Sequence, residues 1–437
     1  MTDHPRTHRL DAVAWMREAS PYIRAHRGQT FVVYFGGEAV NGKGFDGLVQ
    51  DLILLCGLGI KLIVVHGARP QIDAMIDDAG IEPTFAGDLR VTDATALACV
   101  KAAVAAVRIE LEARLSQAAL DIRSRGSGLT VAGGNFVIAR PAGVVNGVDL
   151  RFTGDVRRID RNAIERRLND GEMVLVSPLG YSPTGEVFNL NSLDLANAVA
   201  TEVKASKLIL MTDPPGIVDR DGSIVRQLTV RDARSFVSSS PGGARILERA
   251  IRACQFGVGR VHIVDRSIDG VLIEELFTRD GVGTLLSNTP FDQLRLATIE
   301  DVGGILGLIE PLEHDGSLVK RSREKLEIEI DHFSVIVREG IVVACGALYP
   351  LASAMGEIAC IAVHPDYRRG GFGNAVLGAL EHRAHAADLR QLFVLTTHAT
   401  HWFQESGYRR ANISDLPVAR QALYNLQRNS IVLVKEL

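Results

Sequence analysis

An apolar strand that runs directly into a basic, glycine-dense turn and then into a helix constrains this chain more than any other segment. The strand is predicted at residues 356–363, the turn at residues 364–373 and the helix at residues 374–387, where apolar residues recur near a helical period. Such a turn presents successive backbone N–H groups and the positive end of a helix, and its missing side chains let an anion approach closely. The sequence therefore predicts a phosphate or pyrophosphate site here.

The turn also fits a defined motif: Gln or Arg, two residues of any type, Gly, one residue of any type, and then Gly or Ala. Arg368, Gly371 and Gly373 occupy its three specified positions. A plain strand-to-helix turn is the alternative, because so short a motif needs structural context. The context is a second apolar strand at residues 392–395 and then the pairs 402–403 and 407–408. This order resembles the end of the GNAT acetyltransferase fold.

The GNAT resemblance implies an acetyl-CoA site around this turn. The backbone of Ile361 and Val363 is implied to hold the pantetheine arm and the acetyl carbonyl, since the edge of this strand leaves groups free for pairing. The remaining residues implied to contact the cofactor are Cys360, Arg368, Arg369, Gly370, Gly371 and Gly373. Cys360 is interpreted as a packing residue rather than a nucleophile, because no base accompanies it in sequence.

Composition limits the classes of partner. The chain has 437 residues, 48 basic and 52 acidic side chains and a net charge of −4, so nothing in its overall charge favours nucleic acid or anionic lipid. Its five cysteines lack metal-ligand spacing, so no metal site is predicted and reduced thiols in the cytoplasm are expected. Neither a signal peptide nor an apolar run of about 18 residues is present, which disfavours secretion and membrane insertion.

Two α/β patterns divide the chain. Residues 1–27 form an amphipathic N-terminal interaction helix, and residues 28–290 alternate short β-branched strands with helices, which predicts a mostly parallel sheet between helices. Residues 291–437 follow the second pattern, with two helices, a hairpin at residues 333–349 and the strand, turn and helix described above. A chain of this length is expected to hold two or three domains.

The first large segment resembles the amino-acid kinase fold, and acetylglutamate kinase in particular. The motifs that carry this resemblance occur in the family's order: Phe35–Gly37, Val64–Gly67, Leu89–Asp93, Asn189–Asn191, Thr212–Gly216 and Glu275–Thr284. Against the family pattern, Tyr34 replaces a lysine, Ala68 lies in the glycine triplet, Leu193 replaces an aspartate and Leu247 replaces a second lysine. Phosphoryl transfer needs such cations and carboxylates, so a catalytically inactive, regulatory kinase fold is expected. The alternative is that a displaced residue such as Asp194 replaces the lost aspartate and preserves activity.

An arginine site is implied by the arginine-sensitive members of that kinase family. In them a mobile N-terminal helix links subunits into a ring, and the resemblance implies a homo-oligomer, a hexamer, for this chain as well. The residues implied to bind L-arginine are Tyr22, Lys207, His262, Glu275 and Gly281. A carboxylate such as Glu275 can pair a guanidinium through two hydrogen bonds. An ordinary structural role is the alternative for each residue.

An amino-acid kinase fold joined to a GNAT domain resembles the bacterial N-acetylglutamate synthase family over essentially the whole chain. The resemblance implies transfer of acetyl from acetyl-CoA to the amine of L-glutamate, the first step of arginine biosynthesis, with feedback by arginine. Arg321 and Arg428 match the family's substrate arginines, and Ser430 matches the accompanying hydroxyl. Arg323 is interpreted instead as a helix-surface partner of a glutamate four residues on.

Two further residues are predicted to move protons. Attack on a thioester requires a neutral amine, and Glu357 at the start of the strand is the leading base. Thr396 takes the place of the family's serine beside the leaving thiolate, while Tyr408 is the competing proton donor. Two other functions stay open at this point: a bifunctional synthase–kinase, and a non-catalytic amino-acid sensor that merely binds acetyl-CoA.

Overall fold

The chain divides into two compact units, Met1–Thr289 and Pro290–Leu437. The computed structural model describes residues 5–437 except 43, 124–128, 214–215, 220, 238–242, 279–280, 289–291, 339, 352–353, 369–370 and 423–429. Among the described helices, none combines the length and apolar character that a bilayer crossing requires.

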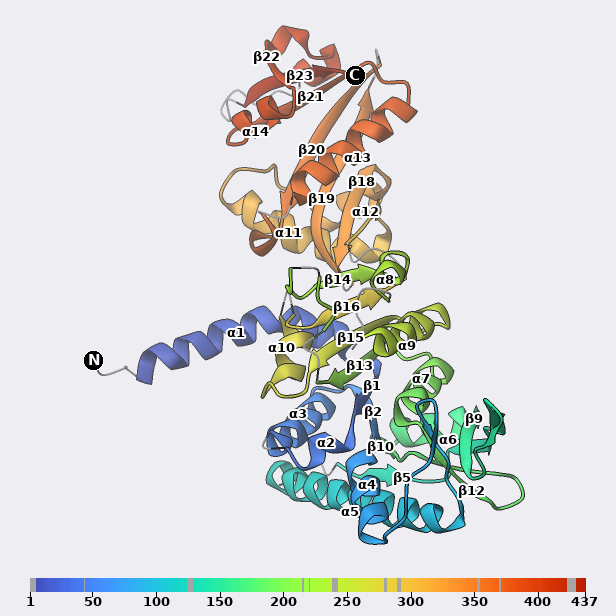
Figure 1. Cartoon of the computed structure of the whole chain (residues 1–437). Helices are drawn as coiled ribbons and strands as arrows, with labels where there is room; N and C mark the ends of the chain where they lie inside the picture. Colours follow the sequence, from blue (N-terminus) through green and yellow to red (C-terminus); the bar gives the residue numbers. More distant parts are fainter. Residues whose placement is uncertain are drawn as a thin grey trace. The chain divides into compact units, whose positions relative to one another are not determined.

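An eight-stranded sheet forms the centre of the first unit, in the order β14-β16-β15-β13-β1-β2-β10-β5 (Figure 1). Every neighbouring pair is parallel except β15 with β16. The predicted mostly parallel α/β sheet is therefore confirmed. The strands are β1 (Thr30–Phe35), β2 (Lys61–His66), β5 (Val131–Gly133), β10 (Met173–Val176), β13 (Lys207–Thr212), β14 (Gln227–Thr229), β15 (Arg260–Asp265) and β16 (Thr284–Ser287).

Helices cover both faces of this sheet, because its central strands are apolar on both sides and all six residues of β13 are buried. One face packs against α3 (Phe45–Gly57), α4 (Arg69–Asp78), α5 (Ala94–Arg123) and α10 (Val271–Phe277). The other packs against α6 (Arg161–Asn169), α7 (Ser192–Glu202), α8 (Val230–Val237) and α9 (Ala244–Gln255).

Several elements of this unit escaped the sequence analysis. A small closed barrel is formed by β6 (Val137–Pro141), β9 (Thr153–Ile159), β11 (Leu179–Tyr181) and β12 (Val187–Leu190). Two short strand pairs, β3 (Phe85–Ala86) with β4 (Leu89–Arg90) and β7 (Val144–Val145) with β8 (Val148–Asp149), and the short helix α2 (Gly37–Val40) are also present. Strands of two to seven residues in polar surroundings carry too little periodic signal to be recognised.

The N-terminal helix α1 (Pro5–His26) extends away from the rest of the first unit (Figure 1). The last turns of α1 anchor it to the first unit. Ala19 and Tyr22 join the core around α10, and His26 Nε2 lies 2.9 Å from the carbonyl oxygen of Leu276 in that helix. Farther along α1, Val13 and Met16 are exposed, which leaves apolar surface on the extended part.

The second unit contains a seven-stranded sheet in the order β17-β18-β19-β20-β21-β23-β22. The strands are β17 (Asp292–Leu296), β18 (Phe333–Arg338), β19 (Ile341–Leu351), β20 (Met355–Val363), β21 (Gln391–Thr396), β22 (Arg409–Ala411) and β23 (Ile431–Glu436). Helix α13 (Phe372–Ala386) packs on one face, and α11 (Val302–His314) and α12 (Arg323–Ile328) pack on the other. Two short helices, α14 (Thr400–Glu405) and α15 (Val418–Gln421), follow β21. The predicted hairpin and strand–turn–helix are both present.

A buried carboxylate fixes the entry into α11. Arg295 donates two hydrogen bonds to Asp301, at 2.7 and 2.9 Å, and the backbone N–H of Thr298 donates a third at 2.7 Å. Burial by itself raises the pKa of Asp301, but the hydrogen bonds from Arg295 and Thr298 outweigh it and hold that pKa below its ordinary value. The ionised carboxylate therefore contributes stability above the unfolded pKa, and this contribution is lost as the pH falls.

We expect Asp301→Asn to lower the free energy of unfolding of the second unit by about 1–3 kcal/mol at pH 7, because hydrogen bonds to a charged group are lost. The difference from the parent chain should shrink as the pH falls below about 4, where the unfolded aspartate is protonated. Urea unfolding at several pH values checks this. A destabilisation that stays constant down to pH 3 would contradict it.

Candidate active site

Strands β20 and β21 are the only parallel neighbours in the described part of the second sheet, and they part after four residues. Their pairing runs from Met355–Gln391 to Ile358–Val394 and then ends. Beyond that point β21 continues against β23, while β20 stays paired with β19. The edge of β20 from residue 359 onward therefore faces an opening instead of a neighbouring strand.

A bulge in β20 lies at this opening. The register between β19 and β20 shifts between Cys345 and Ala347, and Cys360 has a left-handed backbone with φ of 54°. A bulge places an extra residue on one strand and bends it, which helps β20 to turn away from β21. Burial raises the pKa of the Cys360 thiol to about 11, so the thiol is protonated near neutral pH and is a poor nucleophile.

A cavity of about 630 Å³ fills the opening. Seven residues predicted from sequence line it: Cys360, Ile361, Val363, Arg368, Gly371, Gly373 and Thr396. Sequence reasoning missed Leu312, His398 and Trp402, which also line it. Two other predicted residues, Arg369 and Gly370, lie outside the described residues.

The last residues of the glycine-rich turn, Gly371 to Gly373, lead into α13 at the cavity. Gly371 precedes α13 with φ of 74°, a left-handed conformation that favours glycine. At Gly373 a side chain would meet the Trp402 ring at 3.3 Å, and the Trp402 indole N–H donates to Asn374 Oδ1 at 3.0 Å. The start of a 15-residue helix thus opens beside Arg368, with backbone N–H groups and positive charge together.

Glu357 lies on β20 upstream of the opening and has a partner that the sequence did not reveal. Arg420 of α15 donates from Nε and from a terminal nitrogen to the two carboxylate oxygens, at 2.7 and 2.8 Å. The side chains are 13% exposed for Glu357 and 25% exposed for Arg420, so the pair is mostly withdrawn from solvent. No spacing or motif singles out Arg420, because 63 residues separate it from Glu357.

Arg321 lies near the same region of β20. Its charge and that of Glu357 both act on the Cys360 thiol, where Arg321 opposes the effect of burial on the pKa. Tyr349, which pairs with Glu357 across β19 and β20, donates its hydroxyl hydrogen to Glu329 at 2.8 Å. Burial by itself would lower the pKa of Arg321, but Cys360, Tyr349 and Glu329 outweigh it and raise that pKa above its ordinary value. The Arg321 guanidinium is thus held near the point where β20 and β21 stop pairing.

The two candidate proton donors occupy different surroundings. Thr396 lines the cavity, and its hydroxyl oxygen accepts the Ala399 N–H at 2.9 Å, which leaves the hydroxyl hydrogen available to a ligand. Tyr408 is 3% exposed and donates its hydroxyl hydrogen to Glu381 at 3.1 Å. Burial and the Glu381 charge raise the pKa of Tyr408. Of the two residues, Thr396 is the one that lines the cavity.

Ser430 is buried immediately before β23, whose first residue Ile431 pairs with Thr396. This places Ser430 at the same end of β21 as the cavity. Arg428, the second predicted substrate arginine, lies outside the described residues.

A second polar cluster is buried in the first unit. Lys207 Nζ lies 3.3 Å from His262 Nε2, and His262 Nδ1 lies 2.7 Å from Glu275 Oε1. The other oxygen of Glu275 accepts the N–H groups of Val282 and Gly283, at 2.7 and 2.8 Å. Burial would raise the pKa of Glu275, but His262 and these amides lower it below its ordinary value. Four of the residues predicted from sequence, including Gly281 with φ of 59°, therefore lie together.

The fifth, Tyr22, joins this region through the fold. It is in α1, whose last turns pack on α10, the helix that carries Glu275. The N-terminal helix therefore packs on the same helix, α10, that carries Glu275 of the polar cluster.

At the carboxyl-terminal edge of the first sheet, the glycine turns that follow β1 and β2 are closely packed. A side chain at Gly67 would lie 2.9 Å from the Gly37 nitrogen and 3.0 Å from the Gly36 Cα, so the two glycine turns pack directly on each other. Tyr34 is partly buried, with its hydroxyl 3.3 Å from Ser192 Oγ. Asp194, the candidate replacement for the aspartate lost at position 193, accepts a hydrogen bond from Arg249 Nε at 2.7 Å.

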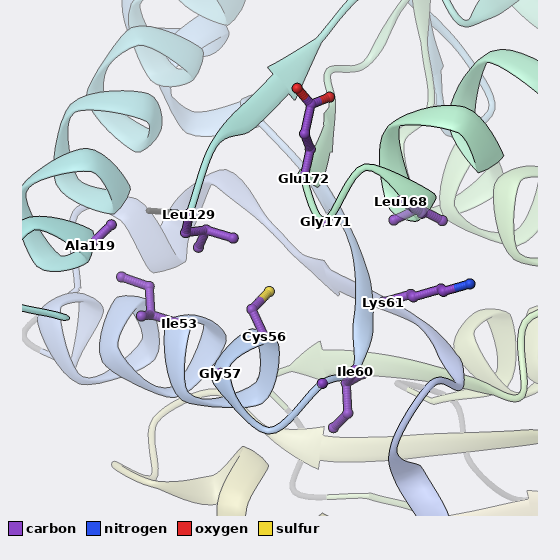
Figure 2. A pocket seen from close by; sticks show the side chains of 11 residues that line it. Ile53, Cys56, Gly57, Ile60, Lys61, Ala119, Leu129, Leu168, Gly171 and Glu172 are labelled. Atoms are coloured by element: carbon purple, nitrogen blue, oxygen red, sulfur yellow. The ribbon is translucent and has the colours of Figure 1, made fainter. Parts of the chain in front are cut away.

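Figure 2 shows a smaller hollow at the opposite edge of the same sheet, where β2 and β10 begin. Its volume is about 290 Å³ and its lining is mostly apolar, with the Cys56 side chain at the centre of the view. Burial raises the pKa of Cys56 to about 12, and Lys61 at the rim donates to Asn169 at 2.8 Å. We assign this hollow no catalytic role, because ligands of such sheets bind at the carboxyl ends of the strands.

Known proteins resemble the chain over nearly all of its length. The amino acid kinase family matches residues 29–265, and the acetyltransferase (GNAT) family matches residues 307–408. The amino-acid acetyltransferases of Ectopseudomonas mendocina (strain ymp) and Pseudomonas aeruginosa PAO1 are 50% and 51% identical over 430 residues, 98% of this chain and 100% of each relative. The chain belongs to the amino-acid acetyltransferase family.

A solved structure agrees with this membership. The N-acetylglutamate synthase of Neisseria gonorrhoeae, complexed with coenzyme A and L-arginine, is 37% identical, with a TM-score of 0.85 over 97% of this chain and 99% of that one. The resemblances to the amino-acid kinase fold, to GNAT acetyltransferases and to N-acetylglutamate synthase are confirmed, and so is the assignment as an acyltransferase.

For this acetyltransferase we expect Thr396→Val to lower turnover by about 10²- to 10⁴-fold, the usual contribution of a positioned proton donor. Tyr408→Phe removes only a hydrogen bond to Glu381 and should cost about 1 kcal/mol of stability with turnover largely retained. Steady-state acetyl transfer and thermal unfolding of both variants check this. Loss of turnover in Tyr408→Phe with full turnover in Thr396→Val would reverse the assignment.

Proposed function

We propose that this chain transfers the acetyl group of acetyl-CoA to the α-amine of L-glutamate and so forms N-acetylglutamate, the first step of arginine biosynthesis. The parting of β20 from β21, with Glu357 at its closed end, is the observation that carries the proposal. The N. gonorrhoeae enzyme, which is 37% identical, has been solved with coenzyme A and N-acetyl-glutamate.

Acetyl-CoA binds in the cavity of the second unit. Arg368 and the backbone amides that begin α13 hold its pyrophosphate, and the free edge of β20 at Ile361 and Val363 pairs with the pantetheine arm and polarises the acetyl carbonyl. This arrangement brings the thioester to the end of β21, where Thr396 lies. The cavity volume of about 630 Å³ lies within the usual range for ligand sites.

Acyl transfer then requires two proton movements. Glu357 accepts a proton from the glutamate ammonium, and the neutral amine attacks the acetyl carbon, forming the C–N bond while the carbonyl oxygen takes up negative charge. The C–S bond breaks as this intermediate collapses, and Thr396 relays a proton: its oxygen takes up the second proton of the product nitrogen as its hydroxyl hydrogen passes to the departing thiolate. No acyl-enzyme is needed, in agreement with the protonated state of Cys360.

The acceptor's two carboxylates need cationic partners. Arg321, Arg428 and Ser430 are the proposed receptors. Arg321 is supported by its place near Cys360 and Tyr349, and Ser430 by its place beside Thr396 at the start of β23.

The kinase-like unit is proposed to have no phosphoryl transfer and to sense L-arginine through Tyr22, Lys207, His262, Glu275 and Gly281. The contact between the glycine turns and the Arg249–Asp194 pair argue against a bifunctional synthase–kinase. The apolar surface of α1 at Val13 and Met16 supports pairing with further copies of the chain, and we propose a homo-oligomer, a hexamer, in the cytoplasm.

Purified protein should convert acetyl-CoA and L-glutamate into N-acetylglutamate and CoA. We expect Glu357→Gln to lower kcat by about 10²- to 10⁴-fold, the usual contribution of a general base. The affinity for acetyl-CoA should change little, because Glu357 is not among the residues lining the cavity. Product analysis with calorimetry of acetyl-CoA binding checks both points. Full turnover of Glu357→Gln would exclude it as the base, and ATP-dependent phosphorylation of N-acetylglutamate would exclude the inactive kinase unit.

Arginine should lower the rate of acetyl transfer through the buried cluster of the first unit. Glu275→Gln removes the carboxylate charge, so about tenfold or more arginine should be needed for the same effect, since hydrogen bonds to charged groups are worth about 1.5–3 kcal/mol. The ratio of turnover with and without arginine is the readout, and calorimetry gives the arginine affinity. An unchanged response in a folded Glu275→Gln protein would place the arginine site elsewhere.

A further inference from the structure

We propose that the ion pair of Glu357 and Arg420 recognises the zwitterionic head group of the amino-acid acceptor. Arg420 binds the α-carboxylate while Glu357 receives the α-ammonium. This inference rests on the proposed acetyl transfer to glutamate and names a further residue that determines acceptor specificity.

The observation is the geometry of the pair. Arg420 engages both oxygens of Glu357, at 2.7 and 2.8 Å, through two neighbouring nitrogens of one guanidinium. Glu357 is on a strand at the centre of the sheet, and Arg420 is on the four-residue helix α15 that follows β22. Because the proposed base is already held by a fixed cation, the acceptor amine must approach a pair of opposite charges, and not an isolated carboxylate.

An α-amino acid is complementary to such a pair. Its ammonium and its α-carboxylate are both bonded to the α-carbon, so they present a positive group beside a negative group. Placed antiparallel to Glu357 and Arg420, the two pairs form a four-charge array in which every group lies next to opposite charges. An amine within hydrogen-bond distance of Glu357 therefore brings the α-carboxylate within reach of Arg420, which is itself only 2.7 Å from Glu357.

The side-chain carboxylate of glutamate is several bonds farther from the amine and requires a different receptor. Arg321 fits this role. Its Nε is buried and has no hydrogen-bond partner among the described atoms, and its main chain is anchored by the bond from Arg321 N–H to Glu313 at 2.9 Å. Of the receptors proposed above, Arg321 is thus assigned to the side-chain carboxylate, and Arg420 is added as the receptor of the α-carboxylate, which predicts separable effects on specificity.

The alternative is that Arg420 only fixes the orientation of Glu357. Removal of Arg420 would then lower kcat for every acceptor by the same factor, since the base would be misplaced for all of them. Under the proposed role, removal acts mainly on KM and only on the recognition of the α-carboxylate, because a site built to pair one group discriminates strongly against analogues that lack it.

The experiment compares three acceptors: L-glutamate, L-glutamate α-amide and L-glutamine, which lacks the γ-carboxylate. The proteins are the parent chain, Arg420→Ala, Arg420→Lys, and Arg409→Ala as a matched control, since Arg409 is an exposed arginine of β22 paired with Glu436. In Arg420→Ala we expect KM for glutamate to rise roughly 10- to 100-fold, the equivalent of a lost charged hydrogen-bond pair. The preference for glutamate over its α-amide should fall to within about threefold, while the preference over glutamine persists.

Three further results decide the matter. Arg420→Lys should recover part of the preference, added guanidine should partly restore glutamate KM in Arg420→Ala, and Arg409→Ala should match the parent chain. If Arg420→Ala keeps the full preference for glutamate over its α-amide, the assignment is overturned. If the parent chain acetylates none of the three acceptors, the proposed function itself fails, which a defect confined to Arg420→Ala does not produce.

Discussion

Strands β20 and β21 pair from Met355 to Ile358 and then part, and the rest of the catalytic arrangement depends on that separation. It leaves the backbone of β20 without a neighbour where a cofactor can pair with it, and it opens the cavity toward the first turn of α13. The bulge at Cys360 bends β20 at the same point. Because the proposed cofactor contacts are to main-chain groups, we expect the site to depend more on strand geometry than on particular side chains.

The charged groups around this opening come from distant parts of the chain. Glu357 belongs to β20, Arg321 precedes α12 and Arg420 lies in α15. Each is partly withdrawn from water, where pairing of opposite charges is stronger and an unpaired charge is costly. The Glu357 carboxylate and the Arg420 guanidinium satisfy each other. A zwitterionic acceptor can take over both interactions without leaving either charge unpaired.

Much of this could be predicted from sequence, because the decisive signals are local. The order of strand, glycine turn and helix at residues 356–387 defines the cofactor cavity, and the β-branched strands define the parallel sheet of the first unit. Arg420 could not be found in this way, since its role arises from a contact across 63 residues and no motif surrounds it. Tyr408 illustrates the converse: the residue type suits a proton donor, but only packing reveals that its hydroxyl is directed to Glu381. The small barrel was missed because its strands are short and only partly buried.

The account is tested most directly by a crystal structure of the protein with coenzyme A and N-acetylglutamate. We predict pantetheine hydrogen bonds to the backbone of Ile361 and Val363, the acetylated nitrogen beside Glu357, and the α-carboxylate on Arg420. A pantetheine arm bound away from the open edge of β20 would contradict the central claim.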